Sequence, residues 1–182
     1  MRLRNDATGY GLVTKTLHWL TVVLLVLQFT IGYLVDDEGG RGRGRGRGED
    51  SGHGRGRGGD DDYTFGFGDG DDTLLSVHVV IGSLILALTL FRIAWRKLTP
   101  LPAWAPSLSL FERKLATWTE RVLYACLIAI PLSGLALFFT SDDLLAFHIA
   151  THIAFFVAIS VHLGLVLKHQ LINRERLIGR ML

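Results

Sequence analysis

The sequence predicts an all-α integral membrane protein, a four-helix bundle with both termini in the cytoplasm. The chain has 182 residues and a mean hydropathy of +0.34. Its apolar residues are concentrated in four runs with few or no charges, at about residues 17–35, 74–95, 120–139 and 144–168. Each run is long enough to cross roughly 30 Å of hydrocarbon as a helix. Core helices of soluble proteins usually keep a polar face, which these runs lack.

The distribution of positive charge predicts the orientation. Outside the segment 36–72, the chain has 13 of its 19 Lys and Arg residues. All 13 lie in the N-terminal arm, around the connection between the second and third runs, or after the fourth run. Because cytoplasmic segments carry an excess of Lys and Arg, both termini and the connection at 96–121 are expected inside the cell.

The first run is expected to be a retained span rather than a signal peptide. Basic residues precede it, but it is long for a signal core and no small-residue cleavage site follows it. Span one begins with His18 and Trp19. Gly and alternating Arg-Gly dominate the next segment, 36–72, in which six Arg and eleven Asp and Glu give a net charge of −5. Such a segment has too little apolar surface to fold, so it is predicted to be a disordered outer loop and not a nucleic-acid partner.

The remaining three spans complete the bundle. Span two carries His78 near its outer end, and a proline-containing connection leads to span three. Pro131 lies within span three, where proline in lipid usually kinks a helix rather than ending it. The connection at 140–143 is so short that spans three and four are expected to form an antiparallel hairpin. Three glycines are expected to allow the close approach of a flat cofactor: Gly82, Gly134 and Gly164.

Histidines in the spans are the candidate functional residues, because an imidazole inside a bilayer needs a partner. Span four carries His148 and His162, which lie about 21 Å apart along the helix axis and within roughly 40° of each other. Counting depth along the antiparallel spans gives two levels, an inner pair (His18 and His162) and an outer pair (His78 and His148). Geometry alone leaves His152 open as the outer ligand, and His169, at the inner membrane edge, is an alternative contact on the inner level.

A pair of histidines at each level suits haem better than a bare metal ion. Zinc normally takes four protein ligands, whereas haem iron needs only two axial ligands because the porphyrin supplies four nitrogens. The single cysteine, Cys126, and the absence of a C-x-x-C-H motif mean that any haem is held non-covalently. A helix bundle is a suitable place for such a cofactor. Ligation by two histidines fills the coordination sphere and favours electron transfer over oxygen binding.

The motifs of all four spans resemble the bacterial cytochrome b561 family, which is related to the cytochrome b subunits of membrane hydrogenases. They are KTLHWL in span one, SVHVVIGSLIL and FRIAWR in span two, LYACLIAIPLSGL in span three, and the two histidines fourteen residues apart in span four. The sequence departs from the family in the long loop 36–72, and in Glu120, where family members often have a histidine.

The resemblance implies two b haems held by His18, His78, His148 and His162, so that it favours His148 over His152. It also implies transmembrane electron transfer with the quinone pool in the bacterial inner membrane, with lipid, quinone and a possible external redox protein as partners. Two alternatives remain. One is a superoxide oxidase that reduces quinone, which the acidic outer loop disfavours because superoxide is an anion. The other is a haem-bearing membrane anchor for an external dehydrogenase.

Overall fold

Four long helices make up the structure, a computed structural model that describes residues 2–6, 9–42, 71–104, 108–139, 144–173 and 179. All four helices are long and apolar enough to cross a membrane. The described part of the chain contains no strand, so the predicted fold class is confirmed. The elements are α1 (Leu12–Gly42), α2 (Asp71–Leu98), α3 (Leu110–Phe139), α4 (Leu145–Leu167) and a π-helical turn, η2 (Lys168–Ile172).

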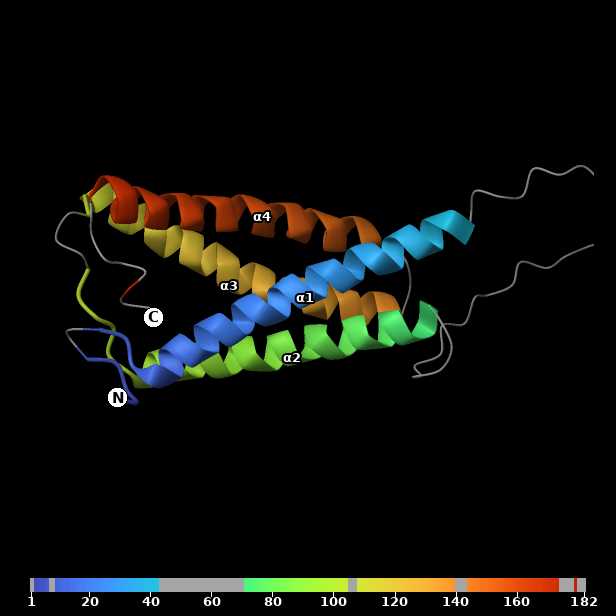
Figure 1. The fold of residues 1–182 in the computed structure, drawn as a ribbon, viewed down its shortest axis with the longest axis horizontal. Helices are drawn as coiled ribbons and strands as arrows, with labels where there is room; N and C mark the ends of the chain where they lie inside the picture. The colour runs from blue at the N-terminus through green and yellow to red at the C-terminus, as the bar shows by residue number, and fades with distance from the viewer. Residues whose placement is uncertain are drawn as a thin grey trace, which may run out of the picture.

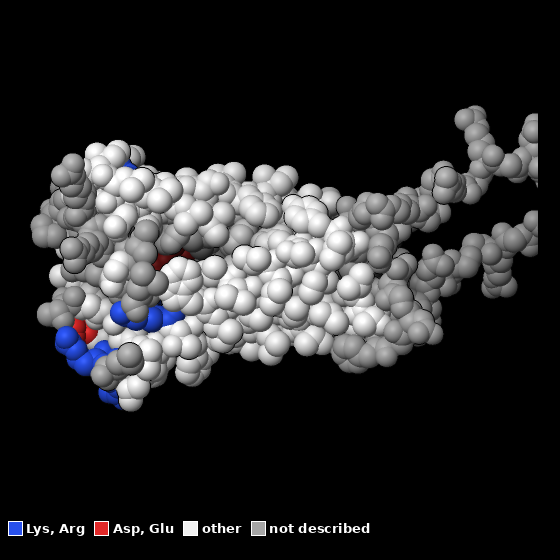
Figure 2. Space-filling model, viewed as in Figure 1, with Lys and Arg blue, Asp and Glu red and all other residues white. Residues whose placement is uncertain are grey.

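The helices form a bundle of antiparallel neighbours. Close backbone packing joins α1 to α2, α2 to α3 and α3 to α4 (Figure 1). The first helix begins, and the fourth ends, at the same end of the bundle (Figure 1). Lys and Arg side chains gather at this end, while the middle of the visible face is uncharged (Figure 2). We call it the basic end, and its cytoplasmic location stays a prediction.

The helices extend beyond the apolar runs that predicted them. Helix α1 continues to Gly42 and α2 begins at Asp71, so both ends of the segment 36–72 are helical. Residues 43–70 lie outside the described residues, and with them most of the predicted disordered loop. Helix α3 begins ten residues before the predicted span, and it continues through Pro131.

Ser109 and Glu112 explain the early start of α3. The Ser109 backbone N–H and hydroxyl each donate to Glu112 Oε2 at 2.8 Å, and the Glu112 N–H donates to Ser109 Oγ at 3.3 Å. This reciprocal pattern is a capping box, which satisfies N–H groups at the start of a helix. The polar first turns of α3 therefore form at the basic end, before the apolar run begins.

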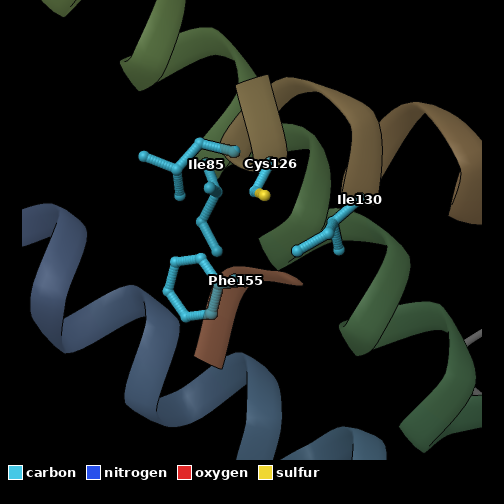
Figure 3. Close-up of a cluster of buried hydrophobic side chains, with 5 residues drawn as sticks. Ile85, Cys126, Ile130 and Phe155 are labelled. Atoms are coloured by element: carbon cyan, nitrogen blue, oxygen red, sulfur yellow. The ribbon is translucent and has the colours of Figure 1, made fainter. Parts of the chain in front are cut away.

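A small apolar core lies between the helices. It consists of five buried side chains from α2, α3 and α4: Ile85, Cys126, Leu127, Ile130 and Phe155 (Figure 3). Large apolar side chains on the outward faces of all four helices are exposed, as expected where lipid covers the bundle. The thiol of Cys126 is free and buried, which agrees with a packing role.

Ion pairs fasten the helices to one another at the basic end. Arg96 of α2 pairs with Glu120 of α3. Glu112 of α3 pairs with Lys168 at 2.6 Å, and His169 Nε2 lies 3.5 Å from the same carboxylate. Helix α3 is thus tied to α2 and to the end of α4, the helix that carries the predicted inner ligand His162.

Candidate functional site

The four predicted ligand histidines are half-buried in the bundle. Electrostatic interactions link His18 of α1 with His162 of α4, and His78 of α2 with His148 of α4. The structure therefore keeps His18 close to His162 and His78 close to His148, and it keeps His152 close to the outer pair as well. Whether they bind iron stays a prediction.

Hydrogen bonding selects one tautomer of His148. The Ser133 hydroxyl donates its single hydrogen to the Ile130 carbonyl at 2.9 Å. The same hydroxyl oxygen lies 2.8 Å from His148 Nδ1, so it accepts a hydrogen bond from the Nδ1–H. The other ring nitrogen, Nε2, then has a free lone pair. This is the arrangement in which a histidine commonly binds a metal, with the second nitrogen fixed by a neighbour.

The surroundings of His78 are incomplete in the absence of a ligand. The amide nitrogen of Gln28 lies 3.0 Å from His78 Nε2, and because this nitrogen only donates, Nε2 accepts and Nδ1 carries the proton. That Nδ1 and the amide oxygen of Gln28 are both buried without a hydrogen-bond partner among the described residues. Buried polar atoms are rarely left unpaired, and iron held by His78 Nε2 would take the lone pair that the Gln28 amide occupies here.

Glycines make room beside the outer pair. A Cβ atom at Gly32 would lie 3.0 Å from His78 Cε1, and one at Gly134 would lie 3.2 Å from His148 Cε1. A Cβ at Gly82 would lie 3.2 Å from the Gln28 amide. Side chains therefore lie close to Gly82 and Gly134, and Gly32 adds a close contact that the sequence did not suggest; the approach of a cofactor at these glycines stays a prediction. A Cβ at Gly164 would meet nothing within 4 Å, so the expectation for this glycine stays a prediction.

The other histidines occupy different surroundings. The ring of His152 lies 4.4 Å from that of His148 and 5.3 Å from that of Phe29. It also interacts electrostatically with His78, so the structure keeps His152 close to the outer pair. His169 is buried at the basic end, where Nδ1 lies 2.8 Å from the Asn173 amide nitrogen. His53 lies outside the described residues.

Arg92 lies beside the inner pair. In the sequence it served only to predict the orientation in the membrane, and its position at the site was not predicted. Its Nη2 lies 3.2 Å from His18 Nδ1, and its guanidinium lies over the ring of Tyr124, 5.6 Å from the centroid. It also interacts electrostatically with His162. The signal that could have identified it is its spacing: it follows His78 by fourteen residues (92 − 78) in the same span.

The donor set fits haem rather than a bare ion. In the described part of the chain, no three His, Cys, Asp or Glu residues gather as a metal site would require. Two histidines facing each other from different helices are sufficient only where a macrocycle supplies the remaining ligands. The glycine contacts, the free Nε2 of His148 and the unpaired atoms near His78 agree with this at the outer level.

Comparison with known proteins identifies the family. The family model of prokaryotic cytochrome b561 matches residues 9–182. The chain belongs to this family. A search of curated proteins and a search of solved structures found no match. The resemblance inferred from the sequence is therefore confirmed.

Family membership, together with four helices able to span a membrane, makes this cytochrome b561 a multi-pass membrane protein. It also implies haem b binding and transmembrane electron transfer. Glu120, at the position where the family often has a histidine, pairs with Arg96. In this cytochrome, that position joins α2 to α3.

Proposed function

We propose that this cytochrome carries electrons across the bacterial inner membrane by means of two b haems and exchanges them with the quinone pool. The inner pair would hold one iron and the outer pair the other, each through histidine Nε2. The observation that carries the proposal is the arrangement of the four histidines in two pairs, each joining two helices.

When bound, haem supplies an iron that gains or loses one electron without gaining a ligand. The paired histidines would hold that iron, and the side chains around them would orient the rings. Ser133 fixes the ring of His148, and Gly32 and Gly134 leave space beside the two outer rings. Iron held by the two histidines of a pair would be suited to electron transfer rather than to oxygen binding.

An apolar layer separates the two pairs. Phe155 lies seven residues from His148 and seven from His162 (155 − 148 and 162 − 155), so it is midway between the two levels on α4. The Phe29 ring stacks on Phe155 with the centroids 5.5 Å apart. This layer is continuous with the apolar core around Cys126 (Figure 3). Charge would therefore cross this layer as electrons rather than as hydrated ions.

Haem content and a reduced-minus-oxidised spectrum test the proposal. Purified protein should contain two b haems per chain, and His78→Ala and His162→Ala should each contain one. His53→Ala, in the segment 36–72, is the matched control and should keep both. A chain without b-type absorption would exclude the proposal.

The outer ligand has its own test, because His148 and His152 lie side by side. We propose His148, whose Nδ1 is fixed by Ser133. His148→Ala should lose one haem, and His152→Ala should retain both. The opposite result would assign the outer iron to His152.

Quinone exchange is tested in membranes. A short-chain quinol is mixed with vesicles that contain the oxidised protein. The haems should then be reduced at a rate that stopped-flow absorbance can measure. Haems that respond to dithionite but not to the quinol would contradict the proposed partner while leaving the electron-transfer proposal intact. An external redox protein would then be sought as the second partner.

A further inference from the structure

We propose that Arg92 is an anion-binding residue of the inner site, and that the anion is a haem propionate. This inference rests on the proposed function, because it assumes that His18 and His162 hold a haem. It starts from a cation within a membrane span, a position where charged side chains are costly and usually functional.

Arg92 stands on α2 at the level of the inner pair. Fourteen residues place Arg92 about 21 Å from His78 along the helix and within roughly 40° of it on the surface. On α4, His148 and His162 have the same separation. The face of α2 that presents a histidine to the outer site therefore presents an arginine to the inner site.

No carboxylate of the described residues pairs with Arg92. The two glutamates of α3 pair with other cations: Glu120 with Arg96, and Glu112 with Lys168. The guanidinium instead contacts the Tyr124 ring and His18 Nδ1. A half-buried guanidinium in these surroundings is a suitable partner for an anion.

The contact with His18 is compatible only with a metal-free histidine. Guanidinium nitrogens donate and do not accept, so the 3.2 Å contact requires a lone pair on His18 Nδ1 and a proton on Nε2. If His18 held iron through Nε2, its remaining proton would lie on Nδ1, and that N–H and the guanidinium would be two donors facing each other. Arg92 consequently needs a different acceptor when the inner site is filled, and a haem propionate supplies a carboxylate there.

The test compares haem with its dimethyl ester, in which both propionates are esterified and uncharged. Apoprotein from haem-deficient cells is titrated in detergent with haem and, separately, with the ester. Each titration should show two binding steps, one for each site. The preference for haem is the ratio of the two dissociation constants, ester to haem, at each step. Arg92→Gln should reduce this preference at least about tenfold at one step only, since a hydrogen bond to a charged group contributes about 1.5–3 kcal/mol. The other step serves as an internal control.

Arg96→Gln is the matched control, because it removes a positive charge one turn away that already has a partner. It should keep the wild-type preference at both steps. Arg92→Met removes the charge without adding a polar group, and it replaces Arg92→Gln in the same titration if that variant does not fold. A preference for haem in the Arg92 variants equal to that of the wild type would overturn the inference. Wild-type protein that binds neither porphyrin would instead overturn the proposed function.

Discussion

The Ser133 hydroxyl determines which nitrogen of His148 is available to a metal. Ser133→Ala removes the hydroxyl acceptor of the Nδ1–H and leaves only the Ile130 carbonyl, so the ring is held less firmly in its tautomer and orientation. Loss of such a partner typically weakens metal binding about 10–100-fold. We expect the variant to bind the outer haem at least about tenfold more weakly, as measured by haem titration of the apoprotein.

Ser83→Ala is the control for this substitution. The Ser83 hydroxyl donates to the Val79 carbonyl of its own helix at 2.8 Å, so its removal should leave both haems in place. Equal haem affinity in Ser133→Ala and the wild type would show that the serine does not orient a ligand.

Gly32 tests the space beside His78. A methyl group at this position would lie 3.0 Å from His78 Cε1 and 3.4 Å from Nδ1, so the ring must move. Overpacking typically costs about 1–3 kcal/mol, which corresponds to roughly tenfold weaker binding or more. Gly32→Ala should therefore lose outer haem, as counted by the haem-to-protein ratio after purification.

Gly9→Ala provides the comparison, because a Cβ there meets nothing within 4 Å and Gly9 precedes α1. It should retain two haems per chain. A Gly32→Ala protein with two haems of unchanged affinity would mean that the ring of His78 is not confined by α1.

At the scale of the element, the capping box at Ser109 controls where α3 begins. Ser109→Ala removes an N-terminal cap, a change that costs about 1 kcal/mol. We expect faster amide hydrogen exchange in the first turn of α3 and a lower midpoint of thermal unfolding. Ser160→Ala is the control, since the exposed Ser160 hydroxyl only donates to the Phe156 carbonyl within α4. Equal exchange in the two variants would contradict the capping role.

The same element shows how far hydropathy could predict the fold. Apolar runs were sufficient to predict four spanning helices, because lipid requires long uncharged segments with internal hydrogen bonds. They could not place the start of α3, which depends on polar residues. The Ser-x-x-Glu pattern of Ser109 and Glu112 was readable in the sequence and would have predicted it. The π-helical turn η2, in which His169 is buried against Glu112, depends on tertiary contacts and had no such signal.

The candidate site was predictable to the same extent. Helix periodicity and antiparallel topology were enough to group the histidines into an inner and an outer level, since both follow from counting residues, but they could not choose between His148 and His152. The neighbours of those histidines were not predictable in this way. The contacts of Gln28, Ser133 and Arg92 depend on how the helices are rotated against one another and on side-chain rotamers, which the hydropathy pattern does not specify.

At the scale of the whole molecule, charge divides the bundle into two unlike ends. Lys and Arg side chains from the N-terminal arm and from α2, α3 and η2 gather at the basic end (Figure 2). The predicted outer segment 36–72 is acidic overall, with six Arg against eleven Asp and Glu. The positive-inside rule counts Lys and Arg rather than net charge, so these six Arg oppose the predicted orientation and make its direct measurement important.

Cysteine labelling can measure that orientation, because the one native thiol, Cys126, is buried. Leu110→Cys places a thiol at an exposed position of the basic end, and Ser51→Cys places one in the segment 36–72. In intact cells with a permeable outer membrane, a membrane-impermeant maleimide should label Ser51→Cys and not Leu110→Cys. Opening the inner membrane should make Leu110→Cys reactive, while wild-type protein stays unlabelled throughout. Labelling of Leu110→Cys in closed cells would place the basic end outside the cytoplasm. The inner pair and Arg92 would then lie on the outer side of the membrane, opposite to the predicted orientation.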